Sequence, residues 1–109
     1  MGLLDEAIGE FQIASKDPAR AVECCSMLGL CFLEKGIPTL AIQWFQRGLA
    51  SSSIKPEERL GLQYDLGSLY EETGDAENAY RFFLDIYGQN SQYRDVAGRV
   101  KNLEALRGR

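Results

Sequence analysis

Three cysteines, Cys24, Cys25 and Cys31, are the residues of this sequence whose types and spacing come closest to a chemical site. Zinc sites normally combine Cys-x2-Cys pairs or cysteines with histidines, and this chain has no histidine. Adjacent cysteines rarely reach disulfide geometry, and an odd number of thiols is typical of a reducing compartment. We therefore expect reduced thiols that pack as small apolar side chains, no metal or other cofactor, and a cytoplasmic location.

Hydroxyl groups offer no better candidate for catalysis. Ser51, Ser52 and Ser53 stand together, but no histidine can act as their base and no motif places another activating group beside them. The 11 glycines are scattered along the chain and form no phosphate-binding loop. A hydrolase that uses carboxylates alone stays open, although no residue pattern favours one. We predict that the chain is not an enzyme.

Charge and hydropathy exclude two further classes of partner. The net charge of −4 argues against a nucleic-acid platform, which normally carries a basic stripe. No apolar run approaches the roughly 18 residues that a membrane-spanning helix requires, so we expect no membrane insertion.

Two patterns of small and bulky residues recur at fixed distances along the chain. Leu28-Gly29 returns as Leu66-Gly67, 38 residues further on (66 − 28), and an aromatic residue stands three positions after each glycine. Ala-x3-Phe occurs three times, at 7–11, 41–45 and 79–83. A period of this length predicts a stack of like units, each of which buries its apolar face against a neighbour.

These motifs resemble those of the tetratricopeptide repeat family, whose 34-residue helix-turn-helix unit carries W-x2-L-G-x2-Y and then A-x3-F. The first motif reads Cys25-x2-Leu28-Gly29-x2-Phe32 in one repeat and Gln63-x2-Leu66-Gly67-x2-Tyr70 in the next, with Cys and Gln in place of Trp. The match covers roughly residues 2–90. The resemblance implies an all-α fold of about six helices, in which antiparallel helix pairs stack in a right-handed superhelix.

The repeat register divides residues 1–109, taken as a single domain, into four parts. Residues 1–16 correspond to the second helix of a half-repeat, 18–50 and 56–88 to two repeats, and 92–107 to a closing helix. The missing first helix favours a fragment of a larger bacterial-type repeat protein over a natural N-terminal cap.

Capping residues predict where the helices begin and end. Asp17-Pro18 is expected to start a helix, Asp75 to cap another, and Gly36, Gly74 and Gly88 to follow helix ends. The serine-rich stretch 50–57 is predicted to be a longer loop. In the closing helix we expect an apolar face and a basic outer face, the latter carrying Arg94, Arg99, Lys101 and Arg107.

The recurring small residues have a packing role. Gly29 and Gly67, like the alanines of Ala-x3-Phe, are expected where two helices approach closely, and the recurring aromatic residues are expected to fill the space between the helices.

In the family that the chain resembles, the first helix of each repeat lines a concave surface that grips a peptide or a partner domain. The residues that this register turns toward that surface are Glu23, Ser26, Leu30, Leu33, Tyr64, Asp65, Ser68, Glu71, Glu72, Asp95 and Asn102. They lack the Lys and Asn groups with which some members clamp a C-terminal carboxylate, so a basic or apolar segment is the better expected partner. The other interpretation is that the carboxylates are only a solvated face.

We therefore predict a protein-protein interaction module, such as an adaptor or scaffold segment. One alternative is a self-assembly element that forms homo-oligomers through residues 3–15, where Leu3, Leu4, Ile8 and Phe11 would be partly bare. Another is a recruiting segment of a larger enzyme or of a secretion or assembly machine.

Overall fold

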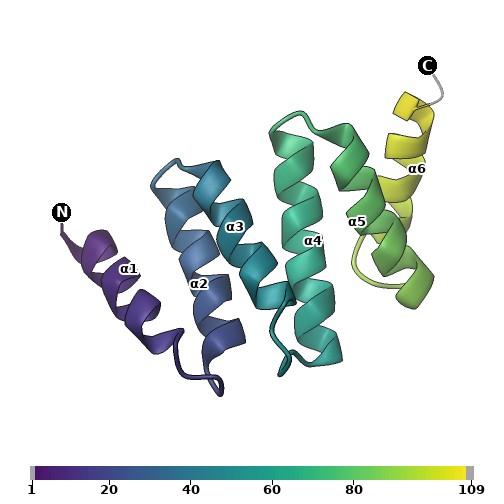
Figure 1. The fold of residues 1–109 in the computed structure, drawn as a ribbon. Coiled ribbons are helices and arrows are strands. Elements are labelled where there is room, and N and C mark those ends of the chain that lie inside the picture. Colours follow the sequence, from purple (N-terminus) through teal and green to yellow (C-terminus); the bar gives the residue numbers. More distant parts are fainter. Residues whose placement is uncertain (1, 108–109) are drawn as a thin grey trace. The chain divides into compact units, whose positions relative to one another are not determined.

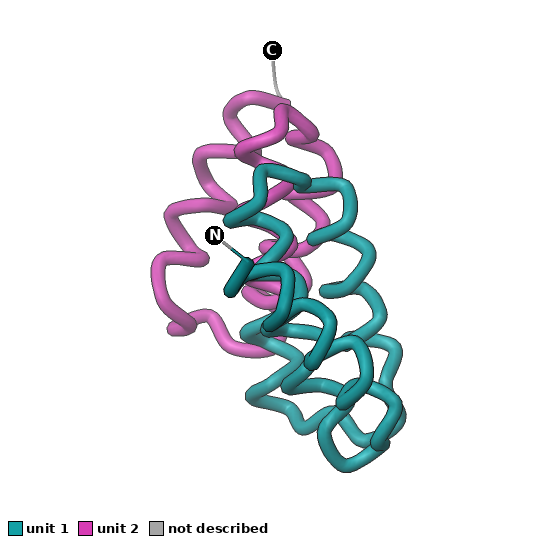
Figure 2. Tube along the Cα trace, turned by 90° about the vertical axis from the view of Figure 1, so that its left-hand side faces the viewer, with its two compact units in different colours: residues 1–62 teal, residues 63–109 magenta. Residues whose placement is uncertain are grey.

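The computed structural model describes residues 2–107, and within this range the chain forms six α-helices and no strand (Figure 1). The helices are α1 (Leu3–Ala14), α2 (Ala21–Glu34), α3 (Pro38–Leu49), α4 (Pro56–Glu72), α5 (Ala76–Gln89) and α6 (Val96–Arg107). The all-helical prediction is confirmed. The chain divides into two compact units, residues 1–62 and residues 63–109, and the boundary falls inside α4 (Figure 2).

The first unit contains α1, α2, α3 and the start of α4. Gly36 ends the turn of α2 with a left-handed backbone (φ +78°), and the N–H of Ile37 donates to the Phe32 carbonyl at 2.9 Å. Pro38 then opens α3, where its missing N–H and fixed φ are tolerated. Because so few residues separate them, α2 and α3 run antiparallel (Figure 1).

The core of this unit follows the predicted register. Phe45 and Ala41 are fully buried, and Phe45 lies directly against the backbone of Gly29. Gly48 leaves similar room for the side chains of Leu62 and Cys25. The prediction that small residues mark close helix approaches is confirmed here.

The second unit repeats these contacts. Gly74 has a φ of +87°, the Asp75 N–H donates to the Tyr70 carbonyl at 2.8 Å, and Asp75 Oδ1 caps α5 by accepting the Asn78 N–H at 3.1 Å. Phe83 is fully buried against Gly67, as Phe45 is against Gly29. Ile86, Val96 and Leu103 close the core between α5 and α6.

Three predicted helix boundaries are wrong. Asp17-Pro18 does not start α2, because the Asp17 carboxylate accepts the Ala19 N–H at 3.0 Å in a turn and the helix begins only at Ala21. The closing helix begins at Val96 instead of residue 92, after turns that include Arg94 at φ +42°. Gly88 lies inside α5, which continues to Gln89.

The outer faces also differ in part from the expectation. Leu106, predicted on the apolar face of the closing helix, is 54% exposed. Ile8 of α1, which we expected to be partly bare, is buried, whereas Leu3 is 77% exposed. No helix within residues 2–107 has the length and hydropathy required to cross a membrane.

Candidate functional site

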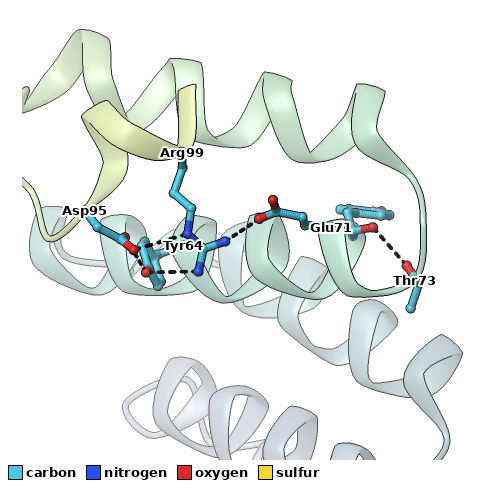
Figure 3. A network of polar contacts seen from close by, with 6 residues as sticks. Tyr64, Glu71, Thr73, Asp95 and Arg99 are labelled. Carbon is cyan, nitrogen blue, oxygen red and sulfur yellow. Dashed lines mark hydrogen bonds and ion pairs between the residues drawn. The ribbon is translucent and has the colours of Figure 1, made fainter. Parts of the chain in front are cut away.

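Four polar side chains of the second unit come together between α4 and α6, and we call them the polar cluster: Tyr64, Glu71, Asp95 and Arg99 (Figure 3). Tyr64 and Glu71 are seven residues apart, so two turns of α4 place them on one face. Asp95 precedes α6 and accepts the Arg99 N–H on its own carbonyl at 3.1 Å, which fixes both residues at the start of that helix.

Arg99 holds the polar cluster together. Its Nε donates to Asp95 Oδ2 at 3.2 Å, its Nη1 forms an ion pair with Glu71, and its Nη2 lies 3.4 Å from the Tyr64 hydroxyl (Figure 3). The Tyr64 hydroxyl in turn donates to Asp95 Oδ1 at 2.6 Å. The prediction that Arg99 belongs to the outer face of the closing helix is therefore wrong, because Arg99 points toward α4.

Aromatic rings support this arrangement from below and beside it. The Tyr64 ring meets Phe83 edge-on at 5.6 Å between centroids, and the Arg99 guanidinium lies 5.0 Å from the Phe83 ring. Arg94 covers Tyr64 from another direction, 4.6 Å from its ring centroid, and also lies over Tyr93 at 5.1 Å. Two arginines thus approach the single tyrosine of α4 that the register turns toward this surface.

The electrostatics of the polar cluster favour structure over catalysis. The hydrogen bond from Tyr64, followed by the Arg99 contacts, lowers the pKa of Asp95, so this carboxylate stays ionised. Burial and the hydrogen bond to Asp95 raise the pKa of Tyr64, so its phenol stays protonated. Neither group has a protonation equilibrium near neutral pH, which a general acid or base would need.

Two predicted residues of α4 lack the partners that the polar cluster provides. Asp65 is half-buried and forms no hydrogen bond or ion pair with any residue in the range 2–107. Burial raises the pKa of Asp65, and the charge of Arg94 offsets this only in part. The Ser68 hydroxyl oxygen is buried and has no hydrogen-bond partner in the described chain. Glu72 is exposed at the end of the same helix.

The remaining predicted residues lie on α2 and α6. On α2, Glu23 is exposed, Ser26 and Leu33 are half-buried, and Leu30 is 47% exposed beside Met27 at 38%. This part of the surface is therefore apolar, whereas the part on α4 is polar. Asn102 is exposed on α6 and joins none of the contacts of the polar cluster.

The cysteines form no reactive group. Cys24, Cys25 and Cys31 are buried free thiols, and no group of three or more His, Cys, Asp or Glu within residues 2–107 could hold a metal ion. Burial raises the pKa of Cys25 and of Cys31, so both stay protonated and poorly nucleophilic.

No protein-family model matches this chain, and a comparison with curated proteins finds no similar sequence. The functional assignment therefore depends on the geometry of the chain itself, above all on the unpaired carboxylate of Asp65.

Proposed function

We propose that this chain is a non-catalytic protein-protein interaction module of the tetratricopeptide-repeat type, which binds a basic segment of a partner protein. The repeat assignment is supported by two contacts in equivalent positions, Gly29 against Phe45 and Gly67 against Phe83. It is also supported by the same left-handed glycine turn at Gly36 and Gly74, 38 residues apart (74 − 36). In this family the activity is recognition, and the fold itself implies no reaction.

Asp65 is the observation that carries the partner's chemistry. A half-buried carboxylate without a hydrogen bond or ion pair is unfavourable in the free protein, and a bound ammonium or guanidinium group would supply the missing interaction. The other carboxylates nearby cannot serve equally, because Glu71 and Asp95 are already paired with Arg99. Glu72 adds a further exposed negative charge to the same helix.

Binding of a lysine-containing peptide is expected to depend on Asp65. The probe is a labelled peptide in which lysines flank a leucine, and the comparison peptide carries glutamates instead. In fluorescence anisotropy, Asp65→Asn should weaken the binding of the lysine peptide about tenfold, which corresponds to about 1.4 kcal/mol. Glu10→Gln removes an exposed carboxylate of α1 and is the matched control. Equal losses in the two variants would mean that only the net charge attracts the peptide.

The same substitution should change the stability of the free protein in a pH-dependent way. The folded state raises the pKa of Asp65, so folding becomes less favourable as the pH rises from below its ordinary value through the raised value. Asn does not ionise, and Asp65→Asn should therefore gain up to about 1 kcal/mol in free energy of unfolding at neutral pH. This gain should disappear in acid. Urea denaturation at a series of pH values measures it, and a loss of stability at neutral pH would contradict the unpaired state of Asp65.

Self-assembly is a second candidate function, favoured by the exposed side chains of α1. Leu3 is 77% exposed and Ile13 is 71% exposed, which is unusual for aliphatic residues on one short helix. Under this function the mass in sedimentation rises above 12.2 kDa with concentration, and Leu3→Glu with Ile13→Glu returns it to the monomer value. A constant mass of 12.2 kDa would exclude self-assembly in the range of concentrations tested.

A further inference from the structure

The first unit contains an open groove of about 720 Å³ that shares no residue with the surface described above. It lies where the C-terminal ends of α1 and α3, the beginning of α2 and the loop after α3 meet. Its size is within the range of sites that hold small ligands or a few side chains of a peptide. The residues that decide its chemistry are Gln12, Lys16, Cys25, Trp44, Arg47 and Ser51.

The charge of this groove is opposite to that of the whole protein. Lys16 and Arg47 are its only charged lining residues, and no carboxylate lines it, although the chain has a net charge of −4. Neither cation forms an ion pair within residues 2–107. Two free cations without a neighbouring anion favour an anionic ligand at this place.

The floor of the groove is apolar and aromatic. Trp44 is half-buried, the Arg47 guanidinium lies 4.6 Å from its ring centroid, and the buried Cys25 contributes a neutral thiol. Trp and Arg are the residue types most often found at the energetic centre of protein interfaces. Gln12 and the hydroxyl group of Ser51 add hydrogen-bonding groups at the edge.

We propose that this groove binds an acidic peptide segment, whose apolar side chain packs on Trp44 while its carboxylates pair with Arg47 and Lys16. A peptide fits better than a phosphate compound because no glycine lines the groove, so the backbone N–H groups offer no phosphate cradle. This site is independent of the one proposed at Asp65, and the two prefer ligands of opposite charge.

Trp44 provides a direct readout, because it is the only tryptophan of the chain. The protein is titrated with a capped peptide in which glutamates flank a leucine, and then with its lysine counterpart. We expect a saturable change in tryptophan emission with the glutamate peptide, weakened by salt, and none with the lysine peptide. The lysine peptide can bind at Asp65 without changing the Trp44 signal, so failure of one proposal leaves the other testable.

Three variants with the same change of charge locate the site. Arg47→Gln and Lys16→Gln should each weaken the binding of the glutamate peptide at least fivefold, and circular dichroism establishes that each variant is folded. Arg59→Gln, which removes an exposed cation of α4 outside the groove, should leave the affinity unchanged. No emission change with the glutamate peptide, or an equal loss in Arg59→Gln, would overturn the proposal. A change in emission with protein concentration alone would assign the groove to a second copy of the chain and would also overturn it.

Discussion

Replacing Gly29 by alanine is expected to lower the free energy of unfolding by about 1–3 kcal/mol, toward the upper end of what overpacking in a core costs. A Cβ atom on Gly29 would lie 2.5 Å from Phe45 Cδ1 and closer still to Cε1. Phe45 is fully buried, so its ring has no free space into which it could move. The substitution therefore forces α2 and α3 apart, and chemical denaturation followed by circular dichroism measures the loss.

Two other glycines give this prediction a scale. Gly67→Ala should cost less, because its Cβ would lie 2.9 Å from Phe83 Cζ, a milder overlap. Gly9→Ala on α1 meets nothing within 4 Å and should stabilise the protein by up to about 1 kcal/mol, through the better helix propensity of alanine. If Gly29→Ala is as harmless as Gly9→Ala, the contact between Gly29 and Phe45 is wrong.

These contacts could be predicted from the sequence because they depend on helical spacing and side-chain size alone. A Leu-Gly pair and an Ala-x3-Phe motif both keep one face of a helix, so their recurrence at 38 residues indicates the same packing twice. The structure places Phe45 against Gly29 and Phe83 against Gly67, as this argument requires. The first Ala-x3-Phe is different, because Ala7 and Phe11 on α1 stay half-exposed.

Helix ends were harder to predict because several local hydrogen bonds compete there. An Asp before a Pro can cap a helix, but it can equally accept an N–H two residues later, and Asp17 does the latter with Ala19. The turns at 90–95 similarly use the Asn90 side chain, which accepts the Gln92 N–H at 3.0 Å. Periodicity alone cannot choose between these states, since apolar spacing at Tyr93 and Val96 fits a helix in both.

The candidate site could be predicted only in part. The register selected Tyr64, Glu71 and Asp95, which do meet in the polar cluster, but it assigned Arg99 to the opposite face. The spacing Asp95-x3-Arg99 contained the missing signal, because residues four apart share a helix face. The unpaired state of Asp65 had no sequence signal, since it depends on which neighbours are already engaged.

Replacing Arg99 by methionine is expected to cost about 1–3 kcal/mol, the range for hydrogen bonds to charged groups that are partly shielded from water. Methionine keeps an apolar stem beside Phe83 and Tyr64, so the loss reports the guanidinium contacts and not a cavity. The Arg99 side chain is only 27% exposed and that of Glu71 is 34% exposed, so solvent screens this pair less than a surface pair. Arg107→Met is the matched control, because Arg107 pairs with Glu77 and Glu104 in a more exposed position and should lose much less.

The pH dependence of this loss identifies its origin. Asp95 has a lowered pKa in the folded state, so its contribution to stability is present above its ordinary pKa and disappears as the pH falls through the lowered value. The difference between wild type and Arg99→Met should therefore be largest at neutral pH and shrink in acid. Arg99→Met also frees the carboxylates of Glu71 and Asp95, and it should strengthen the binding of the lysine peptide while it weakens the fold. A loss of stability equal to that of Arg107→Met, with unchanged peptide binding, would mean that Arg99 is an ordinary surface charge, because a guanidinium that holds two carboxylates must affect both the fold and the negative potential of this surface.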